Sequence, residues 1–275
     1  RATDPDSALA GASPRDALLL GLLHGPAELL PISSSGHLTL IPWLTGMPYA
    51  SLPSERRKTI EIALHAGTAA ALALAPPPSP IAMPSRGRSA LMATATLAPT
   101  AVAGFLARGF VRTRLGTPAT VAVGLVAGSI AMVAADFAPG NRKAGELDAG
   151  DATTIGLAQT ASLWPGVSRS AMAIVGARMR GFASGDSARL ARAGIVPASF
   201  AAAGLESIEA IREGRLGSDS KAALVGAVAA FGSALAARPL VRRLESGGRL
   251  WPWALVRTLT AAATMLRIRS LGNDG

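Results

Sequence analysis

The chain has no cysteine, only three histidines and one tyrosine in 275 residues. Without cysteine it can form no disulfide framework, no thiol nucleophile and no cysteine-ligated metal site. The same absence means that cysteine usage says nothing about the redox state of the compartment. Any catalytic group must therefore come from residues other than cysteine.

Charged residues are also scarce, at 16% of the chain, and aromatic residues reach 4%, whereas apolar residues make up 49%. An ordinary globular domain carries about 25% charged residues, so this composition favours a membrane protein. The mean hydropathy of +0.36 agrees with that interpretation. Because much of the apolar share is alanine, a soluble alanine-rich helical protein is the alternative. We predict an all-α, polytopic membrane helix bundle.

The net charge of +10 would suggest a nucleic-acid partner in a soluble protein. Here the basic residues sit in short groups between apolar stretches, for example Arg56, Arg57 and Lys58. This distribution is typical of loops at a membrane surface. We therefore expect lipid and no nucleic acid as the anionic partner.

Six stretches approach the roughly 20 apolar residues that cross a bilayer. They are 60–75, 89–107, 118–138, 189–208, 222–240 and 251–268. Gly124 and Gly128 in the strongest stretch are spaced so that a neighbouring helix can pack closely. Segments 76–88 and 139–152 are predicted to be loops. Segment 1–16 does not match a signal peptide, so we expect a flexible leader before a single integral-membrane domain at 17–275.

Two apolar segments are too short to span before turn residues break them. They are 17–30, followed by PISSSGH, and 153–164, followed by PGVSRS. Aligned with one gap, His24 matches Gln159 and Ser34 matches Ser168, which suggests two repeats at about 17–138 and about 153–268. Interrupted hydrophobic segments at corresponding positions of two halves indicate a site at their interface. Helix ends that face such a cavity suit an anion such as phosphate.

The first break places several reactive side chains within ten residues of apolar sequence. These are Glu28, Ser33, Ser34, Ser35 and His37. A charge in the middle of a membrane costs about 2.5–3.5 kcal/mol even on a lenient scale, so Glu28 needs a function or a partner. A hydroxyl beside a carboxylate and an imidazole supports nucleophilic attack with a general base, or orientation of a water. The alternative is a simple helix cap formed by the serines.

The second break places Arg169 between Ser168 and Ser170. A guanidinium can hold a phosphate with two hydrogen bonds, and hydroxyls and turn amides add donors. The alternative is an interfacial arginine with Trp164 as its aromatic neighbour. For His65, packing on an apolar helix face is the expected role.

With these residues in view, the chain resembles the bacitracin-resistance type of undecaprenyl-diphosphatase. The resemblance rests on GLLHGPAELLPISSSGHL (21–38) and LWPGVSRSAMAIVGARMRG (163–181), with weaker support from IEIALHAGT (60–68) and PWALVR (252–257). It implies inverted repeats with two re-entrant helix pairs. It also implies hydrolysis of undecaprenyl diphosphate to the monophosphate during recycling of the cell-wall lipid carrier, in a bacterial plasma-membrane cavity open to the outer side.

The resemblance implies roles for individual residues as well. Carried over by motif, the catalytic set is Glu28, Ser34, His37 and Arg169. Substrate contacts are expected from Ser33, Ser35, Ser168, Ser170 and His24.

The chain departs from the family pattern at two positions. His24 stands where the family usually has Glu or Gln, and Ala171 stands where a Gly is common. A magnesium or calcium ion is associated with the family, with Glu28 as a ligand here, and the imidazole of His24 changes the expected coordination.

Two other functions would fit part of the pattern. An acid-phosphatase-like lipid phosphatase also combines Ser-Gly-His with a later Ser-Arg, but it needs a second histidine downstream, and none follows His65. A transporter or flippase for polyprenyl phosphate would share the broken-helix plan. The sequence allows a homo-oligomer in either case, and it leaves open whether Ser34, His37 or a water is the nucleophile.

Overall fold

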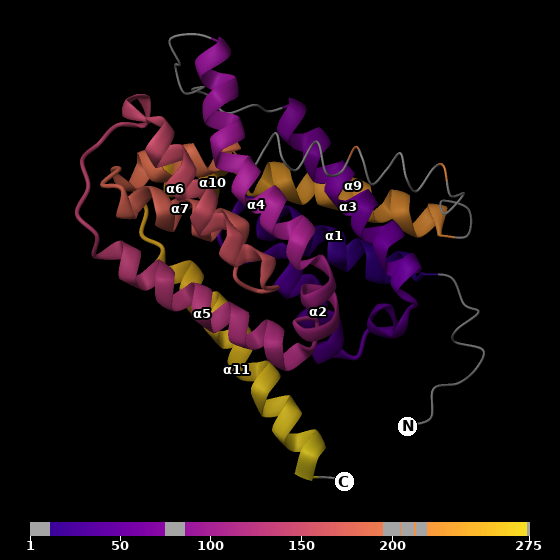
Figure 1. The fold of residues 1–275 in the computed structure, drawn as a ribbon. Coiled ribbons are helices and arrows are strands. Elements are labelled where there is room, and N and C mark those ends of the chain that lie inside the picture. Colours follow the sequence, from indigo (N-terminus) through magenta and orange to yellow (C-terminus); the bar gives the residue numbers. More distant parts are fainter. Residues whose placement is uncertain (1–11, 75–85, 195–203, 205–211, 213–218, 274–275) are drawn as a thin grey trace. The chain divides into compact units, whose positions relative to one another are not determined.

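The computed structural model describes residues 12–74, 86–194, 204, 212 and 219–273 (Figure 1). In this part of the chain every regular element is a helix, which confirms the predicted all-α fold. In order, with η for a 3-10 helix, the elements are α1 (Pro14–Leu29), α2 (Ser34–Thr45), η2 (Pro48–Ser51), α3 (Ser54–Leu74), α4 (Arg86–Arg114), α5 (Pro118–Asp136), η3 (Ala144–Glu146), α6 (Ala149–Thr160), η4 (Ala161–Leu163), α7 (Arg169–Met179), α9 (Ser220–Ala236), α10 (Arg238–Glu245) and α11 (Trp251–Asn273).

The chain divides into two compact units. The first unit consists of Arg1–Pro26, Pro42–Pro76 and Ser199–Ala237, and the second of Ala27–Ile41, Pro77–Ala198 and Arg238–Gly275. The dividing points fall inside α1 and α2, so the segment that joins these helices belongs to the second unit. Both broken segments of the sequence therefore place their turns in the same unit. The repeat boundaries at 17–138 and 153–268 stay a prediction.

In the first unit, α1, α3 and α9 pack through small residues. A Cβ atom placed on Gly67 of α3 would lie 2.0 Å from the carbonyl oxygen of Ala227 in α9. A Cβ atom on Gly21 of α1 would lie 2.4 Å from the carbonyl oxygen of Gly226, also in α9. No real Cβ atom comes this close, so both helices need glycine at these contacts. Close backbone approach of this kind is characteristic of helix pairs in membranes.

The start of α1 is held by polar contacts within the first unit. Asp16 is buried and accepts a hydrogen bond from the backbone N–H of Tyr49 at 3.1 Å. Proline suits the first turn of a helix, and α1 begins at Pro14. The predicted end of the leader at residue 16 is therefore three residues too late, and residues 1–11 lie outside the described part of the chain.

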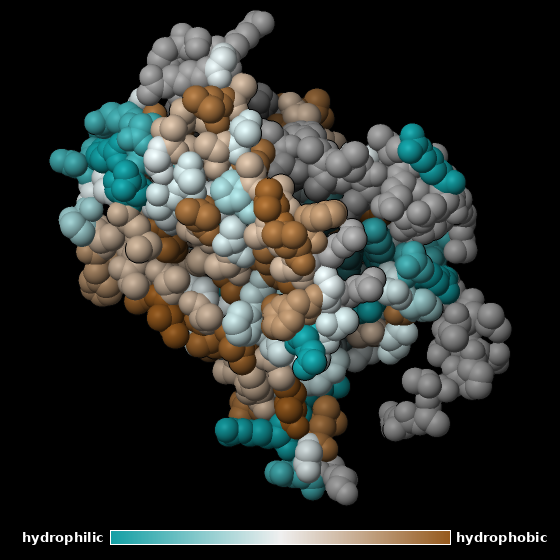
Figure 2. Space-filling model, in the orientation of Figure 1, coloured by the Kyte–Doolittle hydropathy of each residue, from teal (hydrophilic) through white to brown (hydrophobic). Residues whose placement is uncertain are grey.

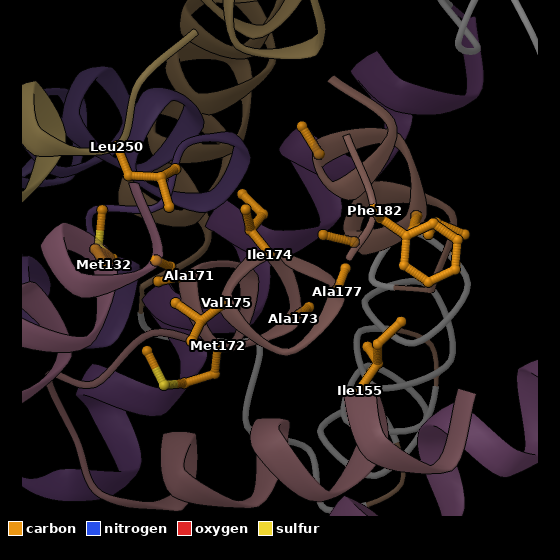
Figure 3. Packing of buried hydrophobic residues seen from close by; sticks show 14 of the residues in the cluster. Met132, Ile155, Ala171, Met172, Ala173, Ile174, Val175, Ala177, Phe182 and Leu250 are labelled. Carbon is orange, nitrogen blue, oxygen red and sulfur yellow. The ribbon is translucent and has the colours of Figure 1, made fainter. Parts of the chain in front are cut away.

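Helix α7 forms the centre of the hydrophobic core of the second unit (Figure 3). All its residues from Ala171 to Arg178 are buried. Met132 of α5, Ile155 of α6 and Leu250 before α11 belong to the same core. A helix surrounded on all sides needs no polar face, which explains the unbroken apolar run AMAIVGA.

The small face of α5 has two neighbours, the turn after α6 and helix α11. A Cβ atom on Gly124 would lie 2.3 Å from the carbonyl oxygen of Pro165, and one on Gly128 would lie 2.7 Å from that of Val167. The close contact at the two glycines is confirmed. At Gly128 the nearest group is the guanidinium of Arg257 in helix α11, as expected for a neighbouring helix, whereas at Gly124 the nearest group belongs to the turn. A non-helical turn lies there, because its carbonyl groups can approach α5 only where side chains are absent.

Among the residues that the structure describes, two helices are long and apolar enough to cross a membrane, namely Ser89–Ala107 within α4 and Pro118–Asp136. The predicted spans 89–107 and 118–138 are thus confirmed. The outward side chains of α5 and α11, at the lower left of Figure 2, are mostly hydrophobic. An apolar groove of about 400 Å³ runs between these two helices, lined by residues such as Val126, Ile130 and Met265.

The other predicted spans fare differently. Residues 60–74 of one predicted span lie in α3, and the predicted span 251–268 lies in α11. Neither helix combines the length and the mean hydropathy of a membrane span. Stretch 222–240 is divided between α9 and α10, which qualify only as a pair. Much of 189–208 lies outside the described residues. Most of the loop predicted at 76–88 lies outside the described residues, and its last three residues belong to α4, which begins at Arg86. The loop predicted at 139–152 ends earlier than expected, since α6 begins at Ala149.

Asp136, the last residue of α5, joins three parts of the second unit. Its carboxylate forms an ion pair with Arg178 of α7, and both side chains are almost fully buried. The same carboxylate accepts the backbone N–H groups of Leu250 and Trp251 at 2.9 and 2.8 Å. Asp136 therefore caps the start of α11 as well as neutralising a buried guanidinium.

The Asp136→Asn variant is expected to unfold at a clearly lower temperature than the wild type. Arg178 would then be a buried charge without its carboxylate, and such a loss typically costs about 3–5 kcal/mol. Adding Arg178→Met to the same chain should recover most of the loss, because it removes the stranded charge. Thermal unfolding in detergent measures both changes. Equal unfolding temperatures for the single and double variants would contradict this account.

Asp151 in the first turn of α6 binds two arginines outside the predicted spans. Arg142 donates through Nη2 at 2.6 Å and Arg180 donates through Nε at 2.7 Å. Burial would raise the pKa of Asp151, but the hydrogen bonds from the two guanidiniums outweigh it and lower the pKa to about 2. The unfolded chain has the ordinary value near 3.8, so this stabilisation is present above about pH 4 and is lost as the pH falls toward 2.

The pH dependence of unfolding tests this ion-pair cluster. The gap in unfolding temperature between the wild type and Asp151→Asn should be constant above about pH 5 and should narrow below about pH 4, where the wild-type carboxyl gains its proton. Comparing two proteins at each pH cancels the effect of other titrating groups. A gap that stays constant down to about pH 2 would show that the pairing with the arginines does not lower this pKa.

Candidate active site

The first polar turn lies between α1 and α2, and Ser33 shapes it. Its backbone has a φ of 79°, in the left-handed region that residues other than glycine rarely adopt. The Ser33 hydroxyl accepts the N–H of Gly36 at 3.3 Å, and its carbonyl accepts the N–H of His37 at 3.1 Å. Ser33 is therefore the cap of α2, as the simple capping hypothesis expected. This cap leaves the next residue, Ser34, free for another role.

Ser34 and Glu28 form the shortest polar contact at this turn. The Ser34 hydroxyl donates to Oε2 of Glu28 at 2.6 Å. A carboxylate in this position can take the proton when the serine oxygen attacks, so the pair has the form of an activated nucleophile and its base. The sequence offered both Glu28 and His37 as acceptors for the proton of the Ser34 hydroxyl. In the structure this hydroxyl donates its hydrogen bond to Glu28.

His37 is held in one orientation by the same turn. Its Nδ1 lies 2.9 Å from the carbonyl oxygen of Ser33, and its Nε2 lies 3.3 Å from the hydroxyl of Thr260 in α11. A carbonyl can only accept, so Nδ1 carries the proton, and in the neutral ring Nε2 keeps its lone pair. No hydrogen bond between His37 and Ser34 is recorded in the described chain. The recorded partners of His37 are thus Ser33 and Thr260, and its Nε2 is a second basic atom near the turn.

The second polar turn lies between α6 and α7 and repeats the geometry of the first. Ser168 has a φ of 74°, and its hydroxyl accepts the N–H of Ala171 at 3.3 Å. Its hydroxyl also lies 3.1 Å from that of Ser170, as the hydroxyls of Ser33 and Ser35 lie 3.4 Å apart. The capping residues of the two turns are therefore Ser33 and Ser168. The predicted match of Ser34 with Ser168 is wrong by one residue, because the serine with positive φ sets the register.

Arg169 is the counterpart of Ser34 at the second turn. It is the first residue of α7 and its side chain is exposed, with no protein partner recorded for it among the described residues. The first N–H groups of α2 and α7 have no partners inside their helices, and the positive ends of both helix dipoles lie there. The two turns thus offer donors and positive charge for an anion.

The two turns touch each other directly. The Ser170 hydroxyl donates to the carbonyl oxygen of Leu30 at 3.3 Å. A Cβ atom on Gly36 would lie 3.2 Å from the Cα atom of Gly166, whose φ of 99° requires glycine. Glu28, Ser34 and His37 of the first turn are therefore close to the second turn, as the sequence predicted for two facing breaks.

Arg257 of α11 holds both turns in place, although its side chain is completely buried. Its guanidinium donates to the carbonyl oxygens of Pro31 at 3.1 Å, Gly166 at 2.9 Å and Val167 at 3.0 Å. A further bond reaches the carbonyl oxygen of Leu125 in α5 at 3.1 Å. These carbonyls lie outside regular hydrogen-bond ladders or at a helix surface, and one side chain satisfies all four.

Sequence reasoning missed the role of Arg257. It entered only through the short match PWALVR and was not proposed as a site residue. The available signal was an arginine in the middle of an apolar helix, where a charge is expected to have a function or a partner. The partners are backbone carbonyls, which leave no trace in the sequence.

His24 belongs to the first unit, and its contacts there differ from the expected substrate contacts. Its Nδ1 lies 2.9 Å from the Thr68 hydroxyl, and its ring packs against that of His65. The magnesium or calcium ion implied by the resemblance would need six or more oxygen ligands, mostly carboxylates, carbonyls and waters. Around the two turns the recorded carboxylate is Glu28, already bonded to Ser34, so the residues do not fit such an ion well.

The chain is similar to one family of known proteins over most of its length. Residues 17–263 match the family model described as Bacitracin resistance protein BacA. The chain is 32% identical to an undecaprenyl-diphosphatase of Dinoroseobacter shibae over 256 residues, which cover 87% of this chain and 93% of the relative. It is 31% identical to one of Geobacter metallireducens, covering 93% of this chain and 98% of the relative. Undecaprenyl-diphosphatase 1 of Rhodospirillum rubrum is also 31% identical, with 94% and 95% covered.

Replacing Arg257 with methionine is expected to destabilise the second unit. The substitution keeps a long apolar stem but leaves the turn carbonyls without a donor, and each buried group left unsatisfied costs about 1–3 kcal/mol. Arg257→Lys should fall between the wild type and Arg257→Met, since an ammonium has three donors on one atom. Thermal unfolding in detergent gives the ranking. Arg269→Met, an exposed position on the same helix, is the matched control, and an equal effect there would contradict the assignment.

Proposed function

Because the chain belongs to the bacitracin resistance protein family, we propose that it hydrolyses undecaprenyl diphosphate to the monophosphate and phosphate. The relatives named above carry the name of this activity, and they match almost the whole chain. The observation that carries the proposal is the Ser34 hydroxyl bonded to Glu28 at 2.6 Å, at a turn in direct contact with the turn of Arg169. A nucleophile with its base beside an anion-binding helix end is what phosphoryl transfer requires.

The positively charged side of the site would bind the diphosphate. The guanidinium of Arg169 can hold two oxygens of the terminal phosphate, and the hydroxyls of Ser168 and Ser170 add donors. The N–H groups that begin α2 and α7 point at the same anion. These fixed donors neutralise charge on the transferring phosphoryl group, which is the main catalytic requirement of the reaction. Ser33 and Ser35 contribute mainly by shaping the first turn.

The chemical steps follow from the contacts of Ser34. Its oxygen attacks the terminal phosphorus while Glu28 takes the hydroxyl proton. The bond between the terminal phosphorus and the bridging oxygen breaks, and undecaprenyl monophosphate leaves. A water then cleaves the phosphoserine, and the lone pair on Nε2 of His37 is available as the base for that water. Ser34 recovers its proton from Glu28, His37 passes the proton of the water to the solvent, and phosphate is released.

The chain is an integral membrane protein, as its family and its two apolar helices indicate. We propose that it crosses the membrane several times and that the site opens to the outer side. The two turns are then re-entrant, since non-helical backbone at membrane depth must line a cavity or be covered by protein. The hydrogen bonds from Arg257 to the turn carbonyls support this arrangement. The prenyl tail of the substrate would stay in lipid.

Substitutions at Ser34 and Arg169 test the mechanism. Arg169→Ala should lower kcat/KM by about 100- to 1,000-fold, as loss of one donor to developing charge usually does. Ser34→Ala should abolish the phosphoserine that a rapid quench with labelled substrate traps in the wild type. Phosphate release from undecaprenyl diphosphate by purified protein is the assay, and Arg243→Ala, an exposed arginine of α10, is the control. Wild-type rates in Ser34→Ala would exclude serine as the nucleophile.

The same protein in vesicles distinguishes hydrolysis from transport. A phosphatase releases phosphate on the side that holds its site, whether or not lipid moves between leaflets. A carrier for polyprenyl phosphate would move labelled lipid and release no phosphate. Movement of lipid without phosphate release would overturn the proposed function.

A further inference from the structure

Two of the three histidines of the chain meet in the first unit. His24 of α1 and His65 of α3 lie edge to face, with ring centroids 4.5 Å apart and planes at 88°. Their nitrogen ligand atoms lie within 4.8 Å of each other. Packing on an apolar face was expected for His65, and its ring does lie in a contact, but the neighbour is another imidazole. Two adjacent imidazoles can bind one metal ion through their nitrogen lone pairs.

The framework around the pair is rigid. The ring of His24 is fully buried, and Thr68 beneath it is 2% exposed. The helices that carry the two rings are fixed against α9 through Gly21 and Gly67, where no side chain would fit. Residues held in this way lose little freedom when a ligand binds, so the site is preorganised.

Thr68 also selects which nitrogen of His24 can bind a ligand. Its hydroxyl lies 2.9 Å from Nδ1 and can accept the proton of that nitrogen. In this tautomer Nε2 keeps the lone pair that a metal ion needs. Metal-binding histidines commonly have their second nitrogen bonded to such an oxygen, which fixes the ring and raises the basicity of the ligand.

The donor atoms decide the class of ion. Magnesium and calcium take oxygen ligands, whereas imidazole suits zinc, cobalt, nickel and copper. Pairs of imidazoles occur in the ligand sets of many zinc sites.

We propose that His24 and His65 bind a divalent transition-metal ion of the zinc class, in place of the magnesium or calcium associated with the family. Thr68 is a positioning residue that holds His24. The proposal concerns binding of the ion and does not depend on the proposed hydrolysis.

Calorimetric titration of purified, chelator-treated protein without a histidine tag tests the proposal, with zinc ion as the probe and no lipid substrate. One zinc ion per chain is expected, with much weaker binding of calcium and magnesium. His65→Gln should weaken zinc binding by more than about 100-fold, and Thr68→Val by about 10- to 100-fold. With cobalt ion, the wild type should show visible absorption bands that His65→Gln lacks.

His37→Gln is the matched control, since it removes the remaining histidine, which lies at the first polar turn in the second unit. It should lose hydrolysis and keep zinc binding. In chelator, each variant should unfold at the same temperature as the wild type, which shows that it folds. The test uses His65→Gln because His65 is partly exposed, whereas the buried His24 is harder to replace without unfolding the protein. Equal zinc affinity in the wild type and His65→Gln, or tighter binding of calcium than of zinc, would overturn the proposal. Zinc binding without phosphate release would leave this inference standing and remove the proposed function.

Discussion

The structure of the candidate site depends on one buried cation, the guanidinium of Arg257. Two stretches of irregular backbone meet in an apolar surrounding, and their carbonyl groups cannot find water there. Arg257 donates to carbonyls of both stretches and of α5, so a single side chain satisfies the groups that would otherwise oppose the fold. Because it uses backbone acceptors rather than a carboxylate, its positive charge is not cancelled. The turns are thereby held together and kept positively charged.

The hydrogen bonds from Arg257 to the turn carbonyls explain how the site suits phosphate. With the turns fixed, the starts of α2 and α7 and the side chain of Arg169 present donors from two segments far apart in the sequence. Ser33 and Ser168 have positive φ angles, and in this conformation each side chain caps the helix that follows it. The next residue then lies at the tip of the turn. At one tip this residue is Ser34, the proposed nucleophile, and at the other it is the cation Arg169. A shared local geometry therefore carries two different chemical roles.

Sequence patterns predicted much of this arrangement. The low charge and the hydropathy predicted a helical membrane protein, and two of the spans were located to within two residues. The reactive side chains could be found because a carboxylate, serines and a guanidinium are conspicuous in apolar surroundings. The pattern failed where the partner is backbone or comes from another helix. Gly124 and Gly128 indicated close packing but not that a turn would fill the space, and no spacing connects His24 with His65.

The sequence by itself determined the class of fold, the positions of the two breaks and the kinds of chemical group they hold, because hydropathy and residue type act locally. Only the tertiary structure decided which serine caps and which one contacts Glu28, since a shift of one residue depends on a backbone angle that several sequences could adopt. It also decided that Arg257 serves the turns and that two imidazoles face each other. Both depend on the distance between helices, which is set by the size of the residues packed between them and not by their order along the chain.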